Sequence, residues 1–373
     1  MTWRVADVRR VMDDWAPPEW ACGWDRVGLQ IGDPDREVST VAVCLTVCGD
    51  TVAQARAAGA GMIVCHHPVI WKPLGALRMD CAETRLCVEM AASGMACFAA
   101  HTNLDAAPGG VNAALAAALG LRGVKPLFPA AEAEQVKLVT FVPASHLEAV
   151  RRAVSAAGAG VIGDYTECSF STPGTGTFLP GAGASPYSGE KGRVNEEPES
   201  RFETLAPKHR LGAVLRALFG SHPYEEPAYD VVPLVNTDAR AGMGAVGDLP
   251  EPVAAADFAG HVSCALGARV RVVGGGGTGT VRRVAVMGGS GGGEVSRIPA
   301  DADAYVTGDV KYHDALAALE RGLLVVDAGH HGTERCVLPV VAERLRRELP
   351  GLHAAVLEEP DPFTLPPCGP GRV

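Results

Sequence analysis

The sequence lacks long apolar runs and clusters of positive charge. None of the apolar stretches in its 373 residues reaches the roughly 18 residues that a membrane-spanning helix needs. Its start, MTWRVADVRRVMDDW, is charged where a signal peptide is apolar. We therefore expect a cytoplasmic protein with no membrane partner. The net charge of −10, with no run of Lys or Arg, argues against nucleic acid as a partner, because phosphates bind to basic faces.

The eleven cysteines include no C-x-x-C pair, the spacing that many zinc and redox sites use. Several of them, such as Cys44 and Cys97, lie in apolar runs, where cysteine acts as a small hydrophobe. The odd number also argues against a disulfide framework, so we expect reduced thiols. Cys65 stands next to a histidine and is an outside candidate for a site, but its place in a strand favours core packing.

Apolar strands that alternate with amphipathic helices predict an α/β protein, and its length favours two or three domains. The helical spacing of apolar residues predicts a first helix at Val5–Trp15. This order predicts parallel strands, and ligands of such sheets gather outside the carboxyl ends of the strands. The expected strands lie at 38–47, 62–65 and 95–100, and the expected helices between them at 50–58 and 81–92.

The stretch GMIVCHHPVIW, residues 61–71, is the strongest candidate for a site. Its strand ends at His66 and His67, and Pro68 forbids further ladder pairing, so both histidines lie at the rim of a sheet. Successive side chains of an extended chain point in opposite directions. The two imidazoles therefore share one cluster only if the turn re-aims one of them. Otherwise each serves a different ion, or both are capping or solvent-facing groups.

The strand at 95–100 also runs into polar residues, in the order His-Thr-Asn-Leu-Asp. Asp105 offers the carboxylate oxygen that divalent ions bind. His101 is a ligand, a partner of a ligand, or a residue that orients the turn. Asn and Asp before Pro-Gly also form turns, so this motif alone is a weak signal.

Two strands near the end of the chain end in the same way. The strand at 323–327 runs into His330 and Glu334, which are four residues apart across a helix start and can converge on one point. Glu334 could alternatively stabilise only the helix dipole. The strand at 304–306 is followed by Lys311 and His313. Four strand ends with His, three of them with Asp or Glu, favour one shared site.

Residues 135–234 follow a different pattern, which predicts a ferredoxin-like α+β module. Its strands are expected at 135–143, 163–171, 201–205 and 229–234, its helices at 146–157 and 209–219, and a Gly/Pro/Ser-rich connection at 172–188. Glu225 and Glu226 in this module either bind a ligand or form a charged helix exit bounded by prolines.

A polar connection at 236–247 and a helix at 253–266 lead into strands at 270–273 and 281–287. The last of these strands ends in the glycine-rich turn Gly-Gly-Ser-Gly-Gly-Gly, residues 288–293. The turn is either a tight reversal or a cradle of backbone N–H groups for an anion. It lacks the Lys-Ser/Thr of a Walker loop and the spacing of a dinucleotide fingerprint.

Four motifs resemble the NIF-three-like family, whose members are also called GTP cyclohydrolase I type 2 homologs or dinuclear-metal-centre hexameric proteins. The resemblance covers 1–127 and 236–373, which would be two halves of one metal-binding α/β core. The segment 128–235 would be an inserted ferredoxin-like domain, similar to PII-like and CutA-like trimeric modules. The motifs are CHHPVIWKPL, HTNLDAAPGGVN, TGDVKYHDAL and DAGHHGTE.

The resemblance implies two divalent metal ions per chain, of Zn, Fe, Mn or Ni, with Glu334 as the bridge between them. It also implies a toroidal homo-hexamer, with trimer contacts through the insert. The implied ligands are His66, His67, Asp105, His330 and Glu334. One departure is Thr46, which stands where relatives usually carry Asp. His331 varies in the family and is not counted as a ligand.

The function expected from the residues and the resemblance is a metal-dependent hydrolase that acts on a nucleotide or a related small molecule. His101, Lys311 and His313 are the candidate proton carriers or anion contacts. The alternative is a non-catalytic metal-binding or regulatory hexamer, whose insert senses a small ligand. The Cys/His zinc pattern of the well-understood cyclohydrolases is absent from the sequence.

Overall fold

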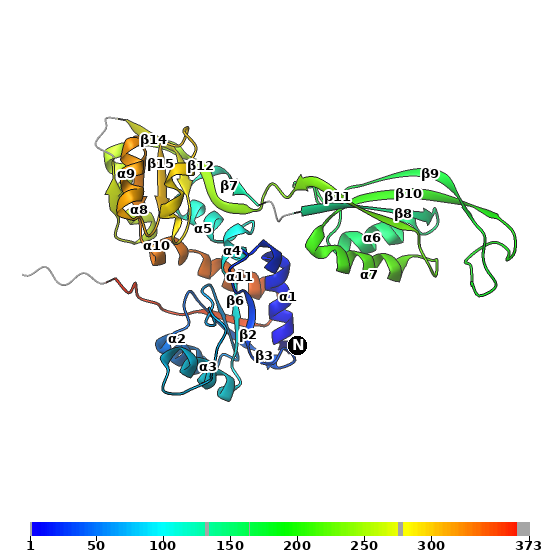
Figure 1. Ribbon diagram of the computed structural model, residues 1–373, viewed down its shortest axis with the longest axis horizontal. Helices are drawn as coiled ribbons and strands as arrows, with labels where there is room; N and C mark the ends of the chain where they lie inside the picture. Colours follow the sequence, from blue (N-terminus) through cyan, green and yellow to red (C-terminus); the bar gives the residue numbers. More distant parts are fainter. Residues whose placement is uncertain (1, 131–133, 164, 275–278, 364–373) are drawn as a thin grey trace, which may run out of the picture. The chain divides into compact units, whose positions relative to one another are not determined.

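The computed structural model describes residues 2–130, 134–163, 165–274 and 279–363 (Figure 1). The chain forms two compact units. The core unit comprises Met1–Pro129 and Arg240–Val373, and the insert unit comprises Ala130–Ala239. The expected domains 1–127, 128–235 and 236–373 remain a prediction about independent folding. Within the described residues, no helix combines the length and apolarity that crossing a membrane requires.

The first sheet of the core unit has five strands in the order β17-β4-β5-β6-β2. β4, β5 and β6 are parallel, as expected; β17, which the sequence did not predict, is parallel to β4, and β2 pairs antiparallel with β6. Side chains of α2 and α3 pack on one face, where Cys65 and Cys97 are buried neighbours. Cys65 is therefore a core residue. The strands are β2 (Gly28–Ile31), β4 (Thr40–Cys44), β5 (Met62–Cys65), β6 (Ala96–Ala99) and β17 (His353–Val356); the helices are α1 (Val5–Trp15), α2 (Gly49–Ala57), α3 (Ala82–Ser93) and α11 (Val337–Glu348).

The second sheet of the core unit has six strands in the order β13-β16-β15-β14-β12-β7. Only β14, β15 and β16 are parallel to one another. Both faces are covered, because Val284 and Val286 pack with α5 and α8, whereas Ala285 packs with η3 and α9. The elements are β7 (Arg122–Pro129), β12 (Gly242–Ala254), β13 (Arg271–Val273), β14 (Thr280–Val286), β15 (Ala304–Thr307), β16 (Leu324–Asp327), α5 (Val111–Ala118), α8 (Ala255–Leu266), η3 (Gly291–Arg297) and α9 (Tyr312–Glu320).

The polar connection expected at 236–247 is wrong, because β12 occupies Gly242–Ala254 and pairs with β7 and β14. Its glycines resemble loop residues but serve close packing. A Cβ added to Gly242 would lie 2.3 Å from the carbonyl oxygen of Phe128 in β7. Gly244 has a φ of +65°, in the left-handed region that favours glycine. The glycines that suggested a loop are therefore required by the close pairing of β12 with its neighbours.

Smaller elements complete the core unit. Two short helices follow strand ends, α4 (Thr102–Ala106) after β6 and α10 (His330–Glu334) after β16. The second holds His330 and Glu334 in one short helix that is separate from α11, whereas the sequence led us to expect both residues at the start of a single longer helix. The remaining elements are β1 (Trp3–Arg4), β3 (Glu37–Val38) and η1 (Pro18–Trp20).

The insert unit, green in Figure 1, has one antiparallel sheet in the order β11-β8-β10-β9. The chain order strand, helix, strand, strand, helix, strand confirms the ferredoxin-like arrangement. Its core joins Leu138 and Phe202 of the sheet to Val150 and Val214 of the two helices. The elements are β8 (Glu134–Pro143), α6 (Leu147–Ala156), β9 (Ser169–Phe178), β10 (Asn195–Pro207), η2 (Lys208–Arg210), α7 (Leu211–Ser221) and β11 (Tyr229–Thr237).

Two expectations in the insert unit are corrected. The connection expected at 172–188 is in part strand, because β9 continues to Phe178. Pro173 and two glycines are tolerated there since β9 is the edge of the sheet. The strand expected at 201–205 begins earlier, at Asn195, to pair with β9 along its length. The finer likeness to PII and CutA modules remains a prediction.

Candidate metal centre

Side chains that follow β5, β6 and β16 meet in one cluster inside the core unit. The cluster therefore joins the carboxyl ends of strands from both sheets, as the sequence led us to expect for one shared site. Within the described residues, two overlapping groups of donor atoms are placed so that they could hold a metal ion. The groups are His66, His67 and His101, and His67, His330 and Glu334; the donor atoms of each group lie within 4.8 Å of one another.

Glu334 lies buried at the centre of this cluster. Its Oε1 lies 3.5 Å from Nε2 of His66 and 3.2 Å from Nε2 of His330. Its Oε2 lies 3.0 Å from Nε2 of His67. The two oxygens of one carboxylate therefore face different histidines, and this is the arrangement that a bridging carboxylate needs.

The spacing of the donor atoms fits a metal ion. Ligands at the corners of a tetrahedron with bonds of about 2.1 Å are separated by roughly 3.4 Å. The distances around Glu334 are 3.0–3.5 Å, and Oδ1 of Asp105 lies 3.7 Å from Nε2 of His66. Both of those last two atoms are buried and have no hydrogen-bond partner among the described residues. Because buried polar atoms are rarely left unpaired, they point to a cation as their partner.

Four imidazoles are oriented by the same device. Each has its Nδ1 bonded to a fixed group outside the cluster, which leaves Nε2 to face inward. Ligand histidines in metal proteins are commonly held in this way. The pairs are His66 with the carbonyl oxygen of Ala100 at 2.8 Å, His67 with Oγ1 of Thr46 at 2.8 Å, His101 with Oδ1 of Asp25 at 2.9 Å, and His330 with Oδ2 of Asp309 at 2.8 Å.

Thr46, Asp25 and Asp309 hold histidines of the cluster in place, and the sequence alone missed or undervalued all three. Thr46 makes an orienting contact to His67. Asp25 also accepts the backbone N–H of Thr102 at 3.0 Å, so it fixes the turn together with His101. Asp309 lies within the third motif, TGDVKYHDAL, and a φ of +55° marks its special backbone. Asp309 could have been found from that motif, whereas no local sequence pattern marks Asp25 as a candidate.

The three candidate proton carriers differ in whether they lie at the cluster. His101 joins the cluster, and its ring centroid lies 5.1 Å from that of His66 and 5.7 Å from that of His67. Lys311 and His313 make no hydrogen bond, ion pair or ring contact with the cluster in the described part of the chain. Lys311 instead donates its backbone N–H to Asp314 at 3.3 Å, at the start of α9. The ring of His313 packs against Tyr312.

The cluster attracts positive charge. Burial opposes ionisation of Glu334, but the charge of His66 and hydrogen bonds from His330 and His67 hold its pKa well below its usual range. Burial also opposes a charged His66, but the negative charge of Glu334 raises the pKa of that imidazole to about 9. Burial raises the pKa of Asp105 to about 6. Protons or divalent cations can supply the charge that these buried carboxylates require.

The pKa values of His330 and Asp25 are also set by hydrogen bonds that oppose the effect of burial. A hydrogen bond to Glu334, with a smaller contribution from Asp309, raises the pKa of His330 to about 9. Burial opposes ionisation of Asp25, but hydrogen bonds from His101 and Thr102 lower its pKa to about 2. Asp25 is therefore a carboxylate at neutral pH and accepts the Nδ1–H of His101.

The glycine-rich turn after β14 closes against the cluster. A Cβ added to Gly289 would lie 2.2 Å from Oε1 of Glu334 and 3.3 Å from Nε2 of His330. The N–H of Gly289 donates to Oγ1 of Thr333 at 2.9 Å, and the N–H of Gly288 donates to Oδ1 of Asn112 at 3.0 Å. These N–H groups are already bonded, so the tight-turn interpretation is favoured over an anion cradle. Glycine is needed here to make room for Glu334.

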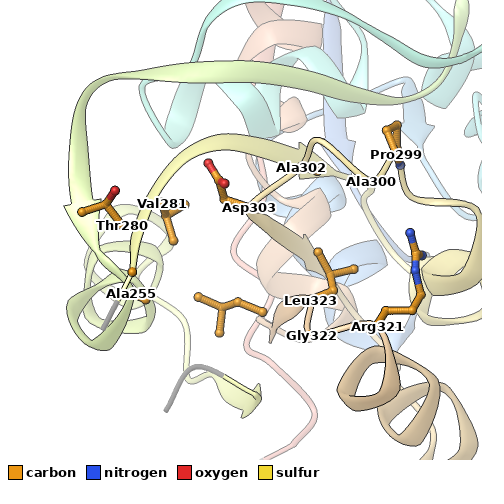
Figure 2. Close-up of a pocket in the computed structure, with 12 residues that line it drawn as sticks. Ala255, Thr280, Val281, Pro299, Ala300, Ala302, Asp303, Arg321, Gly322 and Leu323 are labelled. Atoms are coloured by element: carbon orange, nitrogen blue, oxygen red, sulfur yellow. The ribbon is translucent and has the colours of Figure 1, made fainter. Parts of the chain in front are cut away.

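A separate cavity of about 440 Å³ lies at the amino ends of β14, β15 and β16, away from the cluster at the carboxyl end of β16 (Figure 2). Its charged groups serve the fold. Arg321 donates to the carbonyl oxygens of Val295 and Ile298. Asp303 accepts the backbone N–H groups of Arg282 and Arg283 at 2.9 and 2.8 Å. The cluster around Glu334 is therefore the better candidate for the functional site.

Comparison with known proteins agrees with the four motifs. The chain is 38% identical over 343 residues to a GTP cyclohydrolase 1 type 2 homolog of Halalkalibacterium halodurans, covering 92% of each chain. It is 38% identical over 325 residues to the protein of that name in Bacillus subtilis, covering 87% of each. A solved structure of a Bacillus cereus protein related to NIF3 superposes with a TM-score of 0.86 at 38% identity, covering 97% of this chain and 99% of that one. Residues 3–362 match the Duf34/NIF3 (NGG1p interacting factor 3) family, and the chain belongs to that family.

Proposed function

We propose that this chain holds two divalent metal ions and is a metal-dependent hydrolase of a nucleotide or a related substrate. The observation that carries the proposal is the position of Glu334, whose two carboxylate oxygens face different histidines. His66, Asp105 and Glu334 would hold one ion, and His67, His330 and Glu334 would hold the other. The ions would be Zn, Fe, Mn or Ni, since imidazole and carboxylate donors suit these metals.

The exposure of the cluster supports an enzyme over a structural metal site. The side chains of His66 and Glu334 are buried, whereas those of His67 and His330 are 25% and 33% exposed. One side of the cluster thus reaches solvent. Structural metal sites are closed, but catalytic sites keep a position open for water or substrate.

The chemistry is divided between the ions and the chain. When bound, paired divalent ions lower the pKa of water and polarise a carbonyl or phosphoryl oxygen. His101 donates Nδ1–H to Asp25, so the lone pair of its Nε2 is free on the cluster side. That nitrogen can take a proton from the attacking water and return it to the leaving group. The carboxylate of Asp25 stabilises the imidazolium that forms in between.

The substrate class is supported by the relatives. Their name, GTP cyclohydrolase 1 type 2 homolog, belongs to them and favours a purine nucleotide as the first substrate to test. The resemblance also favours a homo-hexamer with trimer contacts through the insert unit. The alternative of a regulatory metal-binding hexamer shares these ligands but predicts no turnover.

The test combines metal-loaded protein, a panel of nucleotides and product analysis. We expect turnover that chelation abolishes and that added divalent ions restore. The size of the assembly, measured on the same preparation, should not change on chelation if the ions serve catalysis. A fully metallated protein without turnover across the panel would exclude the hydrolase and leave the regulatory assembly.

A further inference from the structure

Two exposed tryptophans lie beside the candidate metal centre. Trp24 is 59% exposed and Trp71 is 42% exposed, and their ring centroids are 5.6 Å apart. Both belong to loops of the first sheet: Trp24 precedes β2, and Trp71 ends the stretch that carries His66 and His67. Exposed apolar surface marks a binding site where it forms one contiguous patch, so what this pair adjoins decides its role.

Both indoles contact His101, which joins them to the cluster. The centroid of His101 lies 6.1 Å from that of Trp24 and 5.6 Å from that of Trp71. The histidine meets both rings edge-on, at interplanar angles of 72° and 76°. Its donor nitrogen lies within 4.8 Å of those of His66 and His67. A molecule that packs on the indoles is therefore separated from the candidate ligand atoms by no more than the side chain of His101.

The backbone beside each tryptophan is fixed although the indoles are exposed. The side-chain amide of Gln30 donates to the carbonyl oxygen of Ile70 at 3.2 Å and accepts the N–H of the same residue at 3.0 Å. This pair anchors the residue before Trp71. Asp25, the residue after Trp24, is bonded to His101 at 2.9 Å. Rigid support of exposed rings lowers the entropy cost of binding.

The angle between the indoles decides how a ligand can bind. A ring held between two parallel faces needs them about 7 Å apart, because each stacking contact takes roughly 3.5 Å. The centroids of Trp24 and Trp71 are closer than that, and the rings are tilted by 52°. The pair is thus a platform and not a clamp. A planar ring stacks on one indole and meets the other at its edge, which are both favoured aromatic arrangements.

We propose that Trp24 and Trp71 bind the planar heteroaromatic ring of the substrate, a purine-type base, next to the metal centre. The proposal rests on the proposed function in placing the reacting atoms at the cluster. A suitable ligand has a flat face for the indoles and polar atoms for the cluster, and a nucleotide has both. Stacking on indole accepts any base, so the platform selects ring-bearing over ring-free substrates.

The test compares two probes, GTP and inorganic triphosphate, on the full-length metal-loaded protein. Calorimetry gives the Kd of each probe, and tryptophan emission reports whether GTP contacts the indoles. Trp24→Ala and Trp71→Ala should each weaken GTP binding about 5- to 100-fold and leave triphosphate binding within twofold. Trp71→Phe should retain most of the affinity. Tyr165→Ala removes an exposed aromatic of the insert unit and is the matched control.

Metal content, assembly size and turnover on the same preparations separate the outcomes. If the alanine variants lose affinity for GTP but not for triphosphate, and the native protein shows no turnover, the platform is supported and the proposed hydrolase is overturned. Turnover with unchanged GTP binding in both alanine variants overturns the platform and leaves the hydrolase. No GTP binding to the native protein overturns the platform. A change of assembly size without a change in Kd also overturns it, because the indoles would then be contacts between copies of the chain.

Discussion

The core unit and the insert unit contain similar elements but place their charged groups differently. In the core unit, the buried carboxylate of Glu334 and the largely buried carboxylate of Asp105 lie against His66. In the insert unit, charged pairs lie at the surface, such as Lys137 with Glu203 at 3.1 Å. Exposed pairs contribute about 0–1 kcal/mol, whereas buried charges destabilise a fold unless they are compensated. The difference shows that the candidate metal centre belongs to the core unit and that the insert unit has an ordinary apolar core.

The largest expected effect is the loss of a ligand in the core unit. His67→Ala removes a donor that lies 3.0 Å from Glu334 and 3.3 Å from His330. We expect turnover to fall at least about a thousandfold, because several kcal/mol of transition-state stabilisation are lost. Steady-state kinetics measure the loss, and light scattering should show an unchanged assembly. His313→Ala, an exposed histidine outside the cluster, is the control. Equal losses in both variants would contradict the assignment of the cluster.

The next effect concerns the partner of His101. Asp25→Asn keeps the shape of the side chain but removes the charge that stabilises the His101 imidazolium. We expect kcat to fall about 10- to 100-fold with unchanged metal content, since partners of this kind contribute that much. The measurement pairs kinetics with elemental analysis, and Asp50→Asn on α2 is the control. A loss of metal with unchanged kcat per bound ion would assign Asp25 a structural role.

A smaller effect is expected at Thr46. Thr46→Val removes the hydroxyl that orients His67 and should weaken metal binding about tenfold. Thr46→Ser should bind like the native protein, and Thr46→Asp should bind at least as tightly, because a carboxylate increases the basicity of the imidazole. Competition with a chromogenic chelator measures these affinities. A valine variant that binds as the native protein does would remove Thr46 from the site.

The smallest effect is a pH dependence in the insert unit. Nε2–H of His222 donates to the carbonyl oxygen of Phe141, and its Nδ1 accepts the N–H of Tyr224. Burial lowers the pKa of His222 below 6.5; the Phe141 hydrogen bond and Glu199 oppose this shift, and His146 adds to it. The unfolded chain then binds more protons, so this stability is present above pH 6.5 and is lost as pH falls toward the folded pKa.

Thermal unfolding of the native protein and of His222→Gln measures this contribution. Glutamine keeps a side-chain N–H donor and an oxygen acceptor and does not titrate. The melting temperature of the native protein should fall by about 2 °C more than that of the variant between pH 7.5 and 5. Parallel curves for the two proteins would show that protonation of His222 does not affect stability.

Deletion of the insert unit should leave the folding and metal binding of the core unit unchanged. Replacing 130–239 by a short Gly/Ser linker should leave cooperative unfolding and full metal content, because the insert unit has its own core. Calorimetry and elemental analysis check both. Loss of the metal together with cooperative unfolding would show that the two units fold as one.

The sequence was most informative where the local pattern and the fold agree. The helix Val5–Trp15 and the strand Met62–Cys65 have the expected bounds. Apolar periodicity defines the first, and flanking Gly and Pro define the second. His330 and Glu334 could also be paired, because four residues make one helical turn. These features depend on short stretches of chain.

Features that depend on distant contacts were not predictable. Asp25 and His101 are 76 residues apart, and no local pattern pairs them. The close approach of Gly289 to Glu334 is set by packing between the turn after β14 and α10. The glycines of β12 were misinterpreted as loop residues for the same reason, because the strand beside them is visible only in the fold.

The count of divalent ions per chain in the native protein and in Glu334→Gln tests the central claim most directly. Both proteins would be loaded with Mn²⁺ or Zn²⁺, dialysed and measured by elemental analysis, with Glu343→Gln on α11 as the control. The account predicts two ions per chain in the native and control proteins and fewer than one in Glu334→Gln, because one carboxylate serves both ions. Equal metal content in all three proteins would contradict it.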